Sequence, residues 1–152
     1  MSLELVQVPY RSGTPPFPLR DGYKFGWRSL MRDPDKATYF EVLRDRTAVA
    51  RVETDENSYF DCYVGVPSNL RITALEIQLI DVLEQHRRQG IGRAVIEDLS
   101  RMYPDRRLVA FSEDADEFWR HLGWDRFERR VDDPRYPSAS RPLYVQGGEG
   151  FS

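Results

Sequence analysis

The chain has 152 residues, of which 40% are hydrophobic and 31% are charged, a balance typical of one soluble globular domain covering residues 1–152. Its net charge of −3 gives no general electrostatic basis for nucleic-acid binding, and no apolar stretch approaches the ~20 residues that span a membrane. The single cysteine excludes an intrachain disulfide, and the amino terminus lacks a secretory-signal pattern, so a cytoplasmic protein is predicted.

The first half of the chain predicts mainly β-structure. Residues 3–8 have the pattern of a first strand, and the proline-rich segment that follows predicts a loop. Residues 38–44 and 47–53 are rich in β-branched and aromatic side chains and predict a hairpin. A further strand is expected over residues 58–66.

The second half predicts strands alternating with helices. Residues 72–83 form the strongest predicted strand, with alternate side chains apolar. A continuous apolar stripe predicts a helix over residues 91–102. The remaining expected elements are a strand at 107–111, a helix at 115–122, and strands at 124–129 and 142–146. This order predicts an α/β protein with a mixed sheet and helices packed on it.

The connection between the strongest strand and the strongest helix carries the main functional signal. Gly90 and Gly92 remove side chains where the helix begins, so its unpaired N–H groups can approach a ligand closely. The helix dipole favours an anion at that position. Arginines at 87, 88 and 93 add charged donors, and the turn therefore predicts a pyrophosphate site. It lacks the Gly-Lys-Ser/Thr ending of a P-loop and the third glycine of the dinucleotide fingerprint.

Two sequence blocks extend this signal. The run Arg87-Arg88-Gln89-Gly90-Ile91-Gly92 resembles the Gln/Arg-x-x-Gly-x-Gly/Ala signature of the GNAT superfamily of acetyl-CoA-dependent N-acetyltransferases. The run from Ala115 to Trp124 resembles that family's Ala-x-x-Phe-Tyr-x-x-x-Gly-Phe segment. The resemblance extends over residues 75–127 at a spacing that suits the family.

The resemblance implies a GNAT-like, mostly antiparallel sheet that splays at the acetyl-CoA site and carries helices on both faces. Acetyl-CoA would be the co-substrate, and an acceptor amine would attack it directly. Backbone groups around Val82 would hold the pantetheine arm, and the turn would hold the pyrophosphate. The implied cofactor-binding residues are Asp81, Val82, Leu83, Arg87, Arg88, Gln89, Gly90, Ile91, Gly92, Arg93, Ala94, Ser112 and Trp119.

Glu76 is the candidate catalytic residue. It lies on the polar side of the predicted strand, six residues before Val82, and some members of the family have a glutamate here as general base. An alkyl amine is protonated at neutral pH and must lose a proton before it attacks. The alternative is an ordinary strand glutamate that is solvated or ion-paired.

Trp119 occupies the position where many members of the family have a tyrosine that protonates the departing thiolate. An indole N–H donates hydrogen bonds but is not a useful acid, so core packing is the expected role and solvent is a candidate proton source. The two histidines are too few and too scattered for a metal site, and no metal is expected.

Three functions stay open on the sequence. The first is an N-acetyltransferase, the second is a non-catalytic acyl-CoA-binding module of the same fold, and the third is a binding protein for another phosphorylated ligand. The acceptor amine, small molecule or peptide, would be selected by residues 11–27 and 132–141, where no motif occurs. The sequence also leaves the oligomeric state open, a homodimer included.

Overall fold

The computed structural model describes residues 1–11, 14–25, 35–56, 59–130 and 141–147. The chain divides into two compact units, one made of Met1–Glu56 and Ile77–Tyr103 and the other of Asn57–Glu76 and Pro104–Ser152. The strand β4 (Ala74–Val82) contributes residues to both. Seven strands follow one another in the hydrogen-bonded order β1-β2-β3-β4-β5-β7-β6.

The first unit begins with three consecutive antiparallel strands, β1 (Glu4–Val8), β2 (Ala37–Arg44) and β3 (Thr47–Asp55). The predicted hairpin is confirmed. Its two turn residues, Asp45 and Arg46, both have positive φ angles, 52° and 66°, the backbone conformation that a tight two-residue hairpin turn requires.

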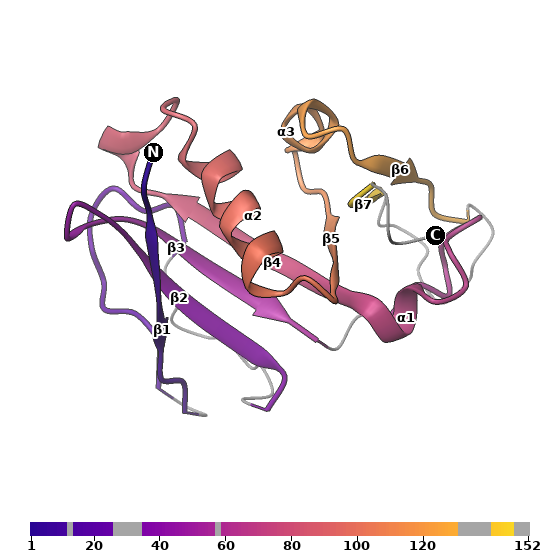
Figure 1. Ribbon diagram of the computed structural model, residues 1–152, viewed down its shortest axis with the longest axis horizontal. Coiled ribbons are helices and arrows are strands. Elements are labelled where there is room, and N and C mark those ends of the chain that lie inside the picture. The colour runs from indigo at the N-terminus through magenta and orange to yellow at the C-terminus, as the bar shows by residue number, and fades with distance from the viewer. Residues whose placement is uncertain (12–13, 26–34, 57–58, 131–140, 148–152) are drawn as a thin grey trace. The chain divides into compact units, whose positions relative to one another are not determined.

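The first unit also contains the connection from β4 to α2 (Figure 1). β4 is followed by the 3₁₀-helix η1 (Glu84–His86) and by α2 (Ile91–Met102). The helix buries Ile91, Val95, Ile96 and Leu99. All but Ile96 belong to the predicted apolar stripe, whose last member, Met102, is exposed. Pro104 follows two residues after the last helical residue and prevents the helix from continuing.

The second unit contains the remaining elements. They are α1 (Leu70–Thr73), β5 (Arg107–Phe111), α3 (Asp116–His121), β6 (Asp125–Phe127) and β7 (Leu143–Val145). The start of β4 pairs in parallel with β5, whereas β5 and β6 each pair antiparallel with β7. The predicted mixed, mostly antiparallel α/β sheet is therefore confirmed.

The structure differs from the sequence expectation between β3 and β4. Within residues 59–66 the only β-contact is an isolated bridge between Tyr63 and Arg129, so the strand expected at 58–66 is wrong over its described part. The strand expected from Ile72 begins only at Ala74. The reason is local: the Leu70 amide donates to the Pro67 carbonyl and starts a short helix.

Within the described residues, no helix is long and apolar enough to cross a membrane. Of the two segments expected to select the acceptor, residues 132–140 lie outside the described residues, whereas in the segment 11–27 only residues 12–13 and 26–27 do.

Candidate functional site

The turn that opens α2 has an unusual backbone. Arg88 and Gly90 both have positive φ angles, 63° and 79°. Glycine adopts this conformation without the steric cost that a side chain adds, which explains the glycine at 90. The first helical hydrogen bond then runs from the Ala94 amide to the Gly90 carbonyl, at 3.1 Å.

The amides at the start of α2 are the central feature of this turn. Within the described part of the chain, the backbone N–H groups of Gln89, Gly90, Ile91 and Gly92 donate no hydrogen bond. No side chain caps the helix. Unpaired donors and the helix dipole act together at this end and favour an anionic ligand. The side chains of Arg88 and Arg93 are exposed beside them.

Arg87 is engaged within the protein as well as standing in the predicted turn. Its Nε donates to the Val82 carbonyl at 2.9 Å, and its Nη2 donates to the Gly22 carbonyl at 2.9 Å. The guanidinium therefore ties the end of β4 to the amino-terminal segment. These bonds hold the turn in place, and a contact between Arg87 and a phosphate stays a prediction.

Asp81 also connects the end of β4 to the amino-terminal segment. Its side chain is 2% exposed, and its two carboxylate oxygens accept hydrogen bonds from the amides of Lys24 and Phe25 at 3.1 and 2.9 Å. A buried carboxylate needs such partners to offset its lost hydration. The carboxylate therefore positions residues 24 and 25.

Leu83 packs closely against the same segment. A Cβ on Gly22, whose φ is +98°, would lie 2.9 Å from a Leu83 side-chain carbon, so only glycine fits there. The Gly22 carbonyl accepts from the Glu84 amide, and the Leu83 amide donates to the Val49 carbonyl, each at 2.9 Å. The backbone N–H of Leu83 is thus already used within the first unit.

Arg44, at the end of β2, holds the other side of the turn. Its Nη2 donates to Gln89 Oε1 at 2.9 Å and lies 3.1 Å from His86 Nδ1. Sequence reasoning missed this residue, and missed Gly22, because no local pattern links positions 22 or 44 to residues 83–90.

Glu76 lies in the second unit and is not solvated. It is 8% exposed and is the last β4 residue paired with β5, opposite Val109. The alternative of a solvated strand glutamate is therefore wrong for Glu76. Burial, the largest cause, raises the pKa of Tyr63 to about 12, and the charge of Glu76 is the smallest contribution to that rise.

Ser112 and Trp119, also in the second unit, are engaged in internal contacts. The Ser112 hydroxyl donates to Asp116 Oδ1 at 2.6 Å and accepts from the Ala115 amide at 3.3 Å, so it bonds two residues at the start of α3. Trp119 is 7% exposed, with its ring centroid 4.8 Å from those of both Phe118 and Trp124. The expected packing role of Trp119 agrees with this position.

Among the described residues, no group of three potential ligand side chains could hold a metal ion. The remaining predicted site residues, Val82 and Ala94, lie in the first unit at the end of β4 and in the first turn of α2.

Comparison with solved structures identifies the fold. YhhK from E. coli, solved by NMR bound to coenzyme A, is 15% identical with a TM-score of 0.54, over 96% of this chain and 100% of that one. A GNAT-family acetyltransferase from Elizabethkingia anophelis with acetyl-CoA bound is 14% identical with a TM-score of 0.53, over 96% and 98%. An acetyltransferase from Thermus thermophilus is 18% identical with a TM-score of 0.50, over 73% of this chain.

The chain spans 64% of the length of the Thermus acetyltransferase. No family model matches the sequence, and no curated protein matches it significantly in sequence. At these identities the likenesses show the fold, which is that of the GNAT acetyltransferases, as the two sequence blocks predict.

Proposed function

We propose that this protein binds acetyl-CoA at the start of α2 and transfers the acetyl group to an amine. One observation carries the proposal: four successive amides, from Gln89 to Gly92, donate no hydrogen bond within the described part of the chain. A row of such donors at a helix start suits a pyrophosphate. The coenzyme A bound to the structural neighbours YhhK and the Elizabethkingia enzyme supports the same ligand class.

The residues of the first unit fit this co-substrate. Gly90 and Gly92 leave the amides accessible, and the exposed Arg88 supplies a charged donor beside them. Arg87 and Arg44 fix the turn from two sides, so the donors are ordered before the ligand arrives. Preorganisation of this kind lowers the entropy lost on binding.

When bound, acetyl-CoA supplies an activated thioester that an amine can attack directly. The protein has to remove a proton from the acceptor, and Glu76 is the proposed base. Its burial limits competition from water for the carboxylate oxygens. Trp119 cannot act as the acid, since its indole holds its proton at any useful pH, so solvent protonates the thiolate.

A second function, acyl-CoA binding without transfer, is favoured by one observation. Trp119 packs between Phe118 and Trp124 at the position where a tyrosine acid is expected from the resemblance. In that case the protein binds acyl-CoA at the α2 turn but does not transfer the acyl group.

Thiol release separates the two functions. The full chain is incubated with acetyl-CoA and a panel of small amines, polyamines, amino acids and peptide amino termini, and free thiol is followed over time. Transfer predicts amine-dependent thiol release together with an acetylated product. Retention on a CoA matrix with no release above the amine-free rate, for every class of amine, would leave the binding module as the function.

A further inference from the structure

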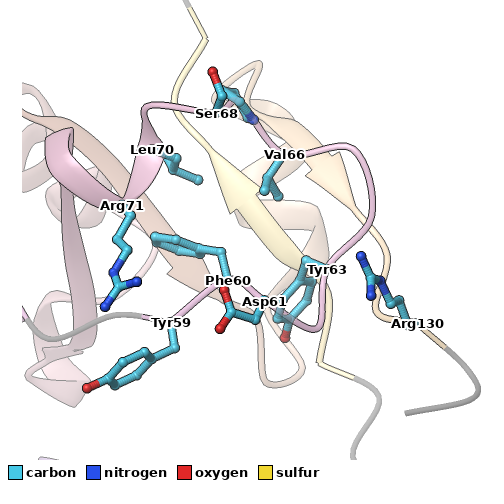
Figure 2. A pocket seen from close by; sticks show the side chains of 10 residues that line it. Tyr59, Phe60, Asp61, Tyr63, Val66, Ser68, Leu70, Arg71 and Arg130 are labelled. Atoms are coloured by element: carbon cyan, nitrogen blue, oxygen red, sulfur yellow. The ribbon is translucent and has the colours of Figure 1, made fainter.

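The second unit contains a cavity of 340 Å³ that is separate from the residues discussed above (Figure 2). It forms where residues 59–71 fold against Arg130. Its shape is fixed by backbone hydrogen bonds, from the Tyr63 amide to the Phe60 carbonyl at 3.0 Å and from the Arg130 amide to the Cys62 carbonyl at 2.7 Å. The cavity is therefore formed without a ligand.

The floor of the cavity is aromatic and rigid. Phe60 and Tyr63 are 6% and 7% exposed, and their rings pack against Phe111 with centroids 6.0 and 5.4 Å away. The Tyr63 hydroxyl donates to the Arg141 carbonyl at 2.6 Å. Burial raises the pKa of that hydroxyl to about 12, so it stays neutral and committed to this bond.

The rim of the cavity carries charges of both signs. Arg71, Arg130 and Asp61 line it, and all three are exposed. The Arg71 guanidinium lies 6.0 Å from the centroid of the Tyr59 ring. Within the described ranges, none of the three charged groups forms an ion pair or a side-chain hydrogen bond. Figure 2 shows Asp61 between the two arginines in that view.

Size and charge together narrow the ligand. Small-molecule sites measure ~300–1,000 Å³, so 340 Å³ suits a small metabolite rather than a nucleotide. A simple anion would pair with an arginine but would be repelled by Asp61. A zwitterion can pair with rim charges of both signs. The Tyr59 ring, 57% exposed, adds a surface for an apolar side chain.

We propose that this cavity binds a free α-amino acid with an aromatic or large aliphatic side chain. Arg71 receives its carboxylate, Asp61 receives its ammonium group, and its side chain rests on the exposed Tyr59 ring. The inference is independent of acetyl transfer and needs no residue of the α2 turn.

Calorimetric titration of the full chain with L-phenylalanine tests the site, with two probes that each lack one charge. 3-Phenylpropionate lacks the ammonium group and phenethylamine lacks the carboxylate. We expect L-phenylalanine to bind about 10-fold more tightly than either probe, the effect of one charge-assisted contact. Equal affinity for all three compounds, or no saturable binding of L-phenylalanine or L-leucine, would overturn the proposal.

Charge-removing variants locate the binding. Asp61→Asn is expected to weaken L-phenylalanine binding about 10-fold without weakening 3-phenylpropionate binding, and Arg71→Gln is expected to weaken the binding of both. Asp105→Asn and Arg120→Gln remove exposed charges of the same unit outside the cavity and should change nothing. Equal losses in the rim variants and these controls would contradict the site.

A third comparison keeps this inference apart from the proposed function. Gly92→Asp, at the α2 turn, should bind L-phenylalanine as the wild type does, whatever happens to its CoA affinity. A parallel loss of L-phenylalanine binding in that variant would show that the amino acid binds elsewhere.

Discussion

The starts of α2 and α3 follow strands in the same way and differ in the side chains around their first amides. At α2 the chain passes through two left-handed residues, Arg88 and Gly90, and the first turn has no acidic residue. At α3 the first turn contains Asp116 and Glu117, and the Ser112 hydroxyl donates to Asp116. Carboxylates at a helix start already complement the helix dipole and repel a second anion, whereas glycines and exposed arginines admit one. The side chains around the first amides, rather than the strand–loop–helix pattern, separate a binding turn from a structural one.

The largest expected effect is a fall in kcat when Glu76 is replaced. Such a fall would show that a residue of the second unit takes part in the reaction. Glu76→Gln keeps the size of the side chain and removes its ability to accept a proton. We expect kcat to fall roughly 10²–10⁴-fold and the acidic limb of the pH–rate profile to shift or disappear.

Glu117→Gln, an exposed change in the same unit, is the control for that measurement. A near-normal rate and an unchanged pH profile for Glu76→Gln would make Glu76 an ordinary buried strand residue. The base would then be water, or the acceptor would react through its free-amine fraction.

The next largest effects are expected at two adjacent arginines of the α2 turn, Arg87 and Arg88. Arg87→Gln removes the donors to Val82 and Gly22, so we expect the free energy of unfolding to fall by about 2 kcal/mol. Arg88→Gln removes an exposed charge at the open turn, so it should keep the stability and weaken CoA binding several-fold. Urea denaturation and CoA titration of both variants measure the two effects. Reversed results, with stability lost at 88 and only affinity lost at 87, would contradict the assigned roles.

A smaller effect, on stability, is expected at Trp119 in α3. Trp119→Phe shrinks a ring packed between two others, and we expect a loss of roughly 1–2 kcal/mol in the free energy of unfolding. Trp124→Phe, in the same cluster, should behave alike. Turnover per folded molecule should persist in both. A collapse of kcat in Trp119→Phe alone, with normal folding and CoA affinity, would give the indole a catalytic role.

The smallest effect is expected at Ser112. Ser112→Ala removes the hydroxyl that accepts from the Ala115 amide and donates to Asp116, and losing such a hydrogen bond costs about 1 kcal/mol. CoA affinity should stay unchanged, because that hydroxyl is already engaged within the second unit. Ser68→Ala, an exposed change, serves as the stability control. A fall in CoA affinity with normal stability would instead place Ser112 in the binding site.

The sequence predicted those parts of the fold whose cause is local. Gly90 and Gly92 mark the start of α2 by themselves, and Ser112 stands only three residues before Ala115, whose amide donates to its hydroxyl. The strand expected at 58–66 is wrong over its described part because its aromatic residues pack around a turn. The β-pairing within residues 59–66 is limited to an isolated bridge between Tyr63 and Arg129.

The parts of the site that the sequence did not predict depend on distant partners. The position of Arg87 in the sequence predicts a phosphate donor. Its hydrogen bond to the Gly22 carbonyl, 65 residues away, shows that it also holds the turn in place. Asp81 is likewise defined by amides 56 and 57 residues away. No periodicity or motif at positions 81 or 87 contains that information.

Titration of CoA into the wild type, Gly92→Ala and Gly92→Asp tests the central claim most directly. Asp in the first turn of a helix suits the helix dipole, so the fold should survive while a negative charge occupies the phosphate site. We expect the affinity to fall at least about 30-fold in Gly92→Asp, the equivalent of ~2 kcal/mol, and only a few-fold in Gly92→Ala. Unchanged CoA affinity in a folded Gly92→Asp variant would contradict the assignment of this turn as the binding site.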